Sequence, residues 1–435
     1  MTALALLLLG VGLFSDDLGT RDRLVTLAAG AAALFVGVAL VSSRVVRPLA
    51  ATVGRGTQRV GGISGRLARE NAARNPGRTA MTAAALMIGL ALVTFVAVLG
   101  AGLRGSVVET IDRQVQADYV VGARDGFNPF PAGAGDVVAR APEVEVASSV
   151  RADAGLVGGE TAYVTGIDPG TITRLYRFEW VEGSDAALAE LGRDGVVVTR
   201  AIADSRGVRV GDRLAITSPG GTTIEPTVVG IYEPPALGSL LGDASLSIEA
   251  WDRTFPQAVN LNTYVDVRGK PGPEVAAALE RRLEQYPEAT LQTKEEYIET
   301  QQRGVNILLN MLYVLLALSV VVSLFGIVNT LVLTVFERTR ELGMLRAIGM
   351  TRRQVRRMIR HESVITALIG GALGIVLGIV LGALLVARVE FIDFSLPIVQ
   401  IVVFALLTIV VGIIAAIFPA RRAARLNPLE ALQYE

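Results

Sequence analysis

The sequence contains no cysteine, one histidine and two lysines among its 435 residues. Without cysteine the chain can form neither a disulfide framework nor a thiolate metal site. His361 stands among arginines and cannot build a zinc site of the usual kind alone, so we expect an interfacial polar residue. Neither Lys270 nor Lys294 is followed by serine or threonine. The chain therefore lacks a P-loop, G-x-x-x-x-G-K-S/T, and any ATP it uses must be hydrolysed by another chain.

Charge is missing from several long apolar runs. Hydrophobic residues make up 51% of the sequence. A bilayer core of about 30 Å needs roughly 20 apolar residues in a helix. The run 2–14 would reach only about 20 Å and has the pattern of a truncated membrane span, the sixth in total. We expect either that the chain is the carboxy-terminal part of something longer or that its start is misplaced. Five further runs of about 17–30 residues are predicted to span fully: 25–41, 79–103, 307–336, 363–387 and 398–418.

The formal net charge of zero hides a strong asymmetry. Segment 43–78 holds eight arginines and one glutamate, a net charge of +7, and segment 337–362 holds eight arginines and three glutamates, a net charge of +5. Basic loops remain in the cytoplasm. With six spans, this predicts a multi-pass protein of the cell membrane with both termini cytoplasmic and residues 104–305 outside.

The sequence of the outside segment 104–305 predicts a mixed α/β domain. Short β-branched runs at 196–199, 213–217 and 226–231 are separated by Gly-Asp and Pro-Gly-Gly turn signals. Residues 275–283 show a helical period, and from residue 293 the chain continues without a break into the apolar run. We therefore expect an α+β domain with a helical stalk that rises from the membrane.

This outside domain shows no pattern typical of an enzyme. It has no G-x-S-x-G motif, and the one histidine lies across the membrane, which excludes a Ser/His/Asp triad. Glu295 and Glu296 are adjacent and would point to different faces of a helix. We expect no catalytic, cofactor-binding or metal-binding residue on this chain, and binding or force transmission is the favoured role.

The expected spans carry no ionisable group, whereas ion-driven carriers usually place such groups inside the membrane. Asn329 could face a substrate path, but bonding to a neighbouring helix is the favoured interpretation. Four glycines repeat every four residues in the run 363–387, which predicts one smooth stripe for close helix packing. They are Gly370, Gly374, Gly378 and Gly382.

The basic segment 337–362 lies between two apolar runs. Leu342, Leu345 and Ile348 are expected to form one apolar stripe on a short helix, which Gly349 would end. Residues 351–354, Thr-x-x-Gln, fit a capping box that starts the returning helix. An amphipathic helix held by anionic lipid is one interpretation. A hinge joined to spans on both sides favours a lever instead.

Several motifs carry a family resemblance. "ERTRELGMLRAIGMTRRQV" resembles the cytoplasmic motif of FtsX-like permeases of the MacB/LolC type, the membrane subunits of type VII ABC transporters. "PARRAARLNPLEALQYE" is similar to their carboxy-terminal signature, and "GVVVTRAIADSRGVRVGDRLAI" followed by "VVGIY" is similar to their extracytoplasmic core domain. "LARENAARNPGRTAMTAAALMIGLAL" resembles the start of their first span. The resemblance covers residues 67–435.

The resemblance implies a membrane α-helical bundle with a four-span FtsX-like core, preceded by an extra helix pair, and a large α+β extracytoplasmic domain. The corresponding regions are 1–42 (extra pair), 43–78 (basic cytoplasmic linker), 79–103 (first core span), 104–305 (extracytoplasmic domain) and 306–435 (permease domain). The pair resembles that of tandem ten-span permeases, of which this chain would be the second half.

By this resemblance, the chain is expected to couple ATP hydrolysis by a separate cytoplasmic ATPase, which would hold the ATP and magnesium, to movement of the outside domain. Expected partners are an ATPase dimer, a second permease half or an identical copy, the lipid bilayer, and an extracellular lipoprotein or hydrolase; no nucleic acid is expected. A receptor or regulator that acts without transport is the alternative. The residues expected to couple to the ATPase are Glu337, Arg338, Glu341, Leu342, Gly343, Leu345, Arg346, Ile348 and Gly349.

Overall fold

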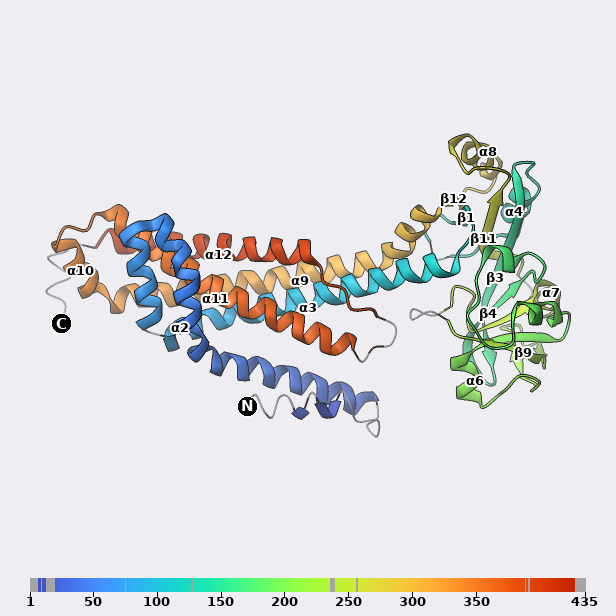
Figure 1. Cartoon of the computed structure of the whole chain (residues 1–435), viewed down its shortest axis with the longest axis horizontal. Coiled ribbons are helices and arrows are strands. Elements are labelled where there is room, and N and C mark those ends of the chain that lie inside the picture. The colour runs from blue at the N-terminus through green and yellow to red at the C-terminus, as the bar shows by residue number, and fades with distance from the viewer. Residues whose placement is uncertain are drawn as a thin grey trace. The chain divides into compact units, whose positions relative to one another are not determined.

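The protein is described here by a computed structural model (Figure 1), which describes residues 7–8, 10–12, 20–74, 76–126, 128–234, 239–255, 257–387, 389 and 392–426. Its long helices contain the apolar runs of the sequence, and its strands lie in the segment between the runs 79–103 and 307–336. The principal helices are α2 (Thr20–Arg74), α3 (Pro76–Gln114), α9 (Lys294–Glu337), α10 (Thr339–Ala347), α11 (Arg352–Val386) and α12 (Ile398–Ala424).

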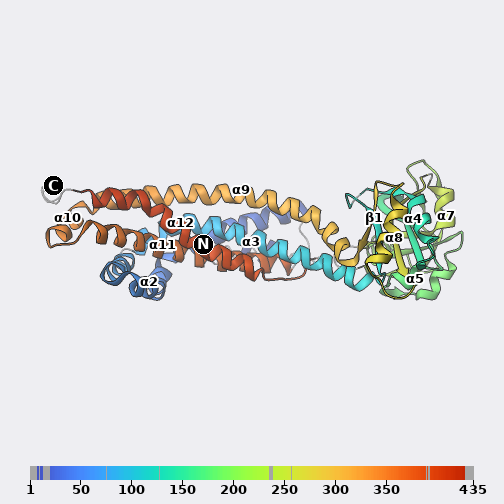
Figure 2. The ribbon, with the colours of Figure 1, turned by 90° about the horizontal axis from the view of Figure 1, so that it is seen from above.

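Four of the described helices are long and apolar enough to cross a membrane, namely α3 from Thr79, α9, α11 and α12 (Figure 2). The expected count of six spans is not confirmed. The run 2–14 lies largely outside the described residues. The run 25–41 lies in α2, and its 17 residues would reach only about 26 Å, less than the roughly 30 Å of a bilayer core.

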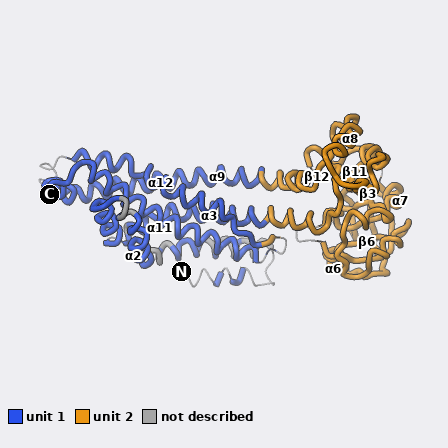
Figure 3. The backbone as a smooth tube through the Cα atoms, turned by 45° about the horizontal axis from the view of Figure 1, so that its top comes forward, with its two compact units in different colours: residues 1–102, 307–390, 394–435 blue, residues 103–306, 391–393 orange. Residues whose placement is uncertain are grey.

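The chain divides into two compact units (Figure 3). Unit 1 comprises Met1–Gly102, Ile307–Glu390 and Phe394–Glu435, and unit 2 comprises Leu103–Asn306 with Phe391–Asp393. Helices α3 and α9 each contribute residues to both units. The expected stalk is therefore present, because α9 runs through 44 residues without a break.

The basic segment 43–78, expected as a linker, is helical in its described residues. Within α2 the chain turns back at Gly62, whose φ of 56° lies in the left-handed region that glycine adopts without steric cost. The buried alanines Ala50, before this turn, and Ala68 and Ala72, after it, pack into a core shared with α3, α11 and α12. This segment is thus part of the bundle.

Close packing of α11 on α3 uses the four repeating glycines. A methyl group added at Gly370 would lie 2.5 Å from the carbonyl oxygen of Ala83. The same addition at Gly374 or Gly378 would meet the carbonyl oxygen of Met87 or Ala91 at 2.6 and 2.5 Å, and at Gly382 it would meet the Val98 side chain at 2.7 Å. No side chain larger than hydrogen fits at these four positions without a shift of α3.

Hydroxyl groups connect the remaining helices of unit 1. Ser323 Oγ on α9 donates to the carbonyl oxygen of Ala85 on α3 (2.9 Å), and Ser363 Oγ on α11 donates to that of Gly412 on α12 (2.7 Å). Asn329, for which an interhelical bond was favoured, is exposed on α9 and forms no hydrogen bond with a described residue. The four helices also share an apolar core that includes Leu86, Ile327, Leu331, Ala367 and Ala415.

Unit 2 is built on one mixed sheet, whose described strands run in the order β12-β1-β11-β3-β4-β10-β6-β9-β5. The strands are β1 (Tyr119–Ala123), β2 (Phe130–Pro131), β3 (Val144–Val157), β4 (Glu160–Ile167), β5 (Trp180–Glu182), β6 (Gly195–Thr199), β7 (Ile216–Thr217), β8 (Thr223–Ile224), β9 (Thr227–Tyr232), β10 (Ala244–Ser247), β11 (Val259–Val267) and β12 (Ala289–Thr293). The α+β class expected for this segment is confirmed.

Short helices cover this sheet. They are α4 (Ala132–Ala139), α5 (Ile172–Leu175), α6 (Arg200–Arg206), α7 (Ile248–Thr254), α8 (Pro273–Leu283) and the 3-10 helix Asp185–Glu190. The predicted helix at 275–283 is α8, and the predicted strands at 196–199 and 226–231 are β6 and β9. The predicted strand at 213–217 is reduced to β7, two residues long.

Candidate coupling site

The junction of α9 and α10 breaks a long helix without proline or glycine. Arg338, with φ −103° and ψ 17°, leaves the helical region and separates the two helices. Thr339 Oγ1 donates to the carbonyl oxygens of Phe336 (2.7 Å) and Val335 (3.2 Å), in the last turn of α9. A threonine side chain that bonds backbone carbonyls in this way competes with continuation of the helix.

Two motifs in succession define the turn from α10 to α11. The amide of Met350 donates to the Leu345 carbonyl (3.0 Å) and that of Gly349 to the Arg346 carbonyl (3.1 Å), the two bonds of a Schellman motif. Gly349 has the positive φ, 110°, that this motif requires. The predicted helix end at Gly349 is confirmed.

The predicted capping box at the start of α11 is also confirmed. The Thr351 side chain accepts a bond from the Gln354 amide, and the Gln354 side chain accepts one from the Thr351 amide. Together with the Schellman motif, the capping box fixes the backbone on both sides of a turn only a few residues long. The direction of α10 relative to α11 is therefore set locally.

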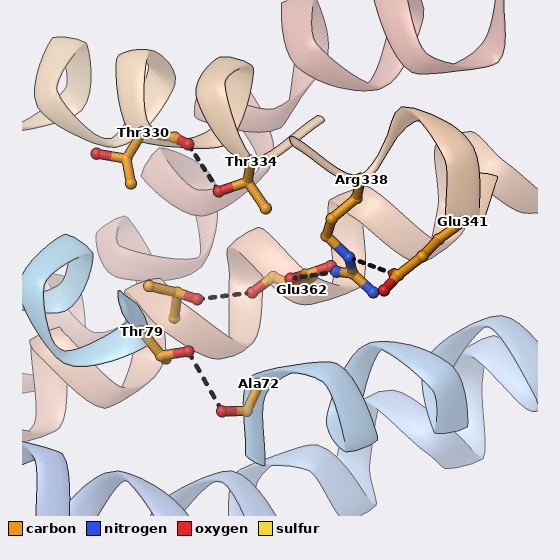
Figure 4. A network of polar contacts seen from close by, with 8 residues as sticks. Ala72, Thr79, Thr330, Thr334, Arg338, Glu341 and Glu362 are labelled. Atoms are coloured by element: carbon orange, nitrogen blue, oxygen red, sulfur yellow. Dashed lines mark hydrogen bonds and ion pairs between the residues drawn. The ribbon is translucent and has the colours of Figure 1, made fainter. Parts of the chain in front are cut away.

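An ion pair ties the start of α10 to α11 (Figure 4). Arg338 Nε donates to Glu341 (2.8 Å) and Nη1 donates to Glu362 (3.4 Å). The Arg338 and Glu362 side chains are only 18% and 16% exposed, whereas Glu341 is 58% exposed. The pair borders a cavity of about 20 Å³ whose lining includes Thr79 and Thr334, large enough for about one water molecule.

Two further contacts hold α10 on the end of the bundle, and a third joins α12 to the end of α9. Leu342 is 3% exposed and packs with Val355 and Met358 of α11. The guanidinium of Arg346 donates to the carbonyl oxygen of Leu426, directly beyond α12. The guanidinium carbon of Arg422 lies 4.3 Å from the centre of the Phe336 ring, a cation–π contact between α12 and the end of α9.

The outer face of α10 is formed by Arg340, Glu341, Met344, Ala347 and Ile348, and is called the α10 face below. All five are exposed, and Met344 and Ile348 expose 45% and 86% of their surface. The expected single stripe of Leu342, Leu345 and Ile348 is wrong, because Leu342 is 3% exposed, Leu345 is half-buried and Ile348 is 86% exposed. Each residue turns a helix by about 100°, so three-residue steps place Ile348 about 120° round from Leu342.

The nine predicted coupling residues therefore separate into two sets. Glu337, Glu341 and Ile348 are exposed, as is Gly349 in the turn. Arg338 and Leu342 face the bundle, Gly343 is buried, and Leu345 and Arg346 are half-buried. Arg340, Met344 and Ala347 lie on the same face at steps of four and three residues, although the sequence analysis did not include them.

Among the described residues, no group of three or more histidine, aspartate or glutamate side chains could hold a metal ion. The α10 face is small and combines apolar and charged side chains, and the ends of α10 are fixed to α9 and α11. A protein bound to that face would act on both long helices.

Two family models match the chain. Residues 313–428 match the FtsX-like permease C-terminal family, and residues 79–286 match the MacB-like periplasmic core domain. The first match contains α10 with its neighbouring helices, and the second contains most of unit 2.

Curated relatives match part of the chain. It is 33% identical over 138 residues to the pyoverdine export ATP-binding/permease protein PvdT of Pseudomonas fluorescens, covering 32% of this chain and 21% of that protein. It is 36% identical over 122 residues to the macrolide export ATP-binding/permease protein MacB of Rhodopirellula baltica, covering 28% and 18%. The chain thus spans about a fifth of the length of these relatives.

Solved structures similar to the chain include two extracytoplasmic regions. The extracellular domain of the noncanonic ABC-type transporter YknZ from Gram-positive bacteria aligns with a TM-score of 0.30 at 11% identity, covering 41% of this chain and 99% of that one. The periplasmic region of MacB from Actinobacillus actinomycetemcomitans aligns with a TM-score of 0.32 at 10% identity, covering 45% and 98%.

Proposed function

The chain belongs to the MacB/FtsX type of ABC transporter permease, a multi-pass membrane protein with an extracytoplasmic α+β domain, and we propose that it converts ATP hydrolysis by a separate cytoplasmic ATPase into movement of that domain. In this proposal the ATPase binds the α10 face. Both termini and α10 lie in the cytoplasm, in agreement with the net charge of +5 in segment 337–362.

The observation that carries the proposal is the fixation of α10 at both of its ends. At its start, Arg338 bonds to Glu362 of α11, and at its end Arg346 bonds to the Leu426 carbonyl. Leu342 fills the core between these two attachments. A tilt of α10 therefore cannot be absorbed in a loose loop and must move α9, α11 or both.

The route to unit 2 is a single helix. α9 begins at Lys294 in unit 2, follows directly on β12, and ends at Glu337, one residue before the α9–α10 junction. Its 44 residues correspond to about 66 Å of helix, roughly twice a bilayer core. Continuity of α9 supports transmission of movement without an intervening joint.

Export or extraction of an amphiphilic molecule is the transport activity we propose, because the names of the relatives describe export of pyoverdine and of macrolides. ATP and magnesium would be held by the partner ATPase, which would act as a dimer. The permease would pair with a second half or a second copy, and an extracellular lipoprotein or hydrolase could receive the movement of unit 2. Control of such a partner without transport is the alternative.

Reconstitution tests the proposal. The chain and the P-loop ATPase that co-purifies with it are placed in phospholipid vesicles, and ATP hydrolysis is compared with that of the chain alone. We expect no hydrolysis by the chain alone, and hydrolysis by the complex that falls when the α10 face is altered. Nucleotide hydrolysis by the isolated chain would contradict the proposal. Stimulated hydrolysis with no movement of solute across the vesicle would favour the regulatory alternative.

A further inference from the structure

A second feature of unit 1, separate from the α10 face, is a cavity of about 510 Å³ between α2, α11 and α12. Its size falls within the range of small-molecule sites in proteins, about 300–1,000 Å³. Three cationic or ionisable side chains of α11 line it, namely Arg357, Arg360 and His361. None of the described residues that line it is acidic.

The lining of this cavity changes from charged to apolar along α11. Arg357, His361, Val364 and Leu368 follow one another at steps of three or four residues, so they form one stripe of the helix. Segment 337–362 carries the charges, and residues 363–387 carry none. The stripe therefore crosses the border between the headgroup layer and the apolar layer of a membrane.

Helix α12 supplies a matching apolar wall. Ile409 and Ile413 line the cavity opposite the apolar part of α11. They lie eight or more residues before Arg421, where the positive end of α12 begins. Since Val364 packs against Gly412 on α12, the apolar residues of the two helices share one depth. The cavity thus has one charged end and one apolar end, and α11 and α12 both contribute to the apolar end.

The charges at the cavity are not neutralised by the protein. Neither Arg357 nor Arg360 forms an ion pair with a described residue, and the neighbouring Glu362 binds Arg338. His361 Nε2 is buried without a hydrogen-bond partner in the part of the chain that the structure describes. Two guanidinium groups that line one cavity favour an anionic ligand, and phosphate accepts hydrogen bonds from guanidinium particularly well.

We propose that this cavity binds an anionic phospholipid of the cytoplasmic leaflet. The phosphate of the headgroup lies between Arg357 and Arg360, and an acyl chain follows the apolar wall from Val364 to Leu368 and Ile409. Free phosphate would satisfy the charges only. The apolar half of the cavity, at the depth of the acyl layer, is the feature that selects a lipid.

The test uses native mass spectrometry of the full chain released from nanodiscs of phosphatidylcholine with a minority of phosphatidylglycerol. We expect the wild type to retain phosphatidylglycerol selectively. Arg357→Gln with Arg360→Gln should lower that retention about 30-fold, on the basis of the usual contribution of each arginine at an anionic surface. The matched control, Arg352→Gln with Arg353→Gln, removes the same charge from the same helix outside the cavity and should retain the lipid.

Two further measurements separate the cavity from a diffuse basic surface. Leu368→Trp fills the apolar half without a change of charge and should reduce retention, whereas addition of inorganic phosphate should not displace the lipid. Equal losses in both arginine pairs, equal retention of both lipids, displacement by phosphate, or full retention in Leu368→Trp would each overturn the proposal.

Discussion

The guanidinium of Arg338, at the α9–α10 junction, lies 3.4 Å from the carboxylate of Glu362 on α11, although the two residues stand 24 positions apart. The same guanidinium also binds the exposed Glu341, one turn further along α10. Arg338 therefore connects the end of α9, the start of α10 and the buried side of α11. Of the two carboxylates, the one of Glu362 is the less accessible to water.

Removal of Arg338 is predicted to cost more than removal of its exposed partner. Arg338→Gln takes away the cation beside the largely buried Glu362 carboxylate and should lower the free energy of unfolding by about 2–3 kcal/mol, less than the loss for a fully buried pair. Glu341→Gln should cost below about 1 kcal/mol. Chemical unfolding of both variants in mild detergent measures the difference. Equal losses would show that the contact with Glu362 contributes nothing.

Ile348→Asp is predicted to separate the chain from its ATPase. The side chain is 86% exposed on the α10 face, and a carboxylate buried there against a partner should raise the Kd by about 30-fold or more. Ile63→Asp, at a position 73% exposed on α2, is the matched control and should bind normally. Co-purification measures both. Retention of the ATPase by Ile348→Asp at the wild-type ratio would favour a lipid anchor instead.

Leu342→Asp is predicted to act differently from Ile348→Asp, because Leu342 lies in the core of the bundle. A carboxylate at that position has no partner among its apolar neighbours and should destabilise the fold by several kcal/mol. We expect a lower yield and a lower unfolding midpoint before any specific loss of ATPase binding. If Leu342→Asp is as stable as the wild type and loses only ATPase binding, Leu342 would lie on the outer surface of α10 and this prediction would be wrong.

Gly374→Ala is predicted to disturb the contact between α11 and α3. The added methyl group would lie 2.6 Å from the Met87 carbonyl oxygen, and such overpacking typically costs about 1–3 kcal/mol. Gly326→Ala on α9 is the control, because its methyl group would meet only the Ala85 side chain at 3.9 Å. Thermal unfolding in detergent should show a loss for the first variant alone. An unchanged midpoint in Gly374→Ala would mean that α3 and α11 separate easily.

The proposed orientation in the membrane is testable because the chain has no native cysteine. Thr222→Cys should react with a membrane-impermeant maleimide in intact cells, whereas Arg353→Cys should react only after the cells are opened. Both positions are exposed, unlike Ser218, which is 4% exposed and would label poorly on either side. Reversed labelling would place unit 2 in the cytoplasm and contradict the proposed topology.

Asp266 in β11 is predicted to make unit 2 less stable at neutral pH than at acidic pH. Burial raises the pKa of Asp266, and the nearby Asp118 adds to this, although the Asp118 amide donates to its carboxylate. The folded state therefore binds this proton more tightly than the unfolded state. The stabilisation that this proton gives to the folded state is fully present below the ordinary pKa of aspartate. It is lost as the pH rises through the raised pKa of Asp266.

Asp266→Asn should remove this dependence while it keeps an oxygen that can accept the Asp118 amide. We expect the variant to exceed the wild type in stability near pH 7, and the difference to shrink as the pH falls toward 4. Fluorescence of Trp180 and Trp251, the two tryptophans of the chain, reports on unit 2 during unfolding of the full protein. A constant difference across this range would contradict the assignment to Asp266.

Local motifs near α10 could be predicted from the sequence, because each depends on residues close in the chain. The glycine at 349 and the Thr351–Gln354 pair satisfy backbone groups within one turn, so their residue types are sufficient signals. The four-residue repeat of glycines likewise indicates a smooth helix face. Which helix approaches that face, α3, follows only from the three-dimensional structure.

The contacts of Arg338 and the outer face of α10 could not be predicted in the same way. Segment 337–362 contains eight arginines, and nothing in the sequence indicates that Arg338 is the one that binds Glu362. Which side of α10 faces outward depends on the rotation of this helix about its own axis, which decides whether Leu342 or Ile348 is buried. An apolar pattern on so short a helix is compatible with either rotation, and packing against Val355 and Met358 decides it.

The length of α9 has a consequence for the size of the movements that this protein needs. A rigid rod of 44 residues, about 66 Å long, that pivots by about 5° at one end displaces its other end by about 6 Å, slightly more than one helical turn. Under the proposed mechanism, a small tilt at α10 would therefore produce a displacement of several ångströms at the start of α9. The amplitude would come from leverage, and the proposed ATPase would need to supply only a short stroke.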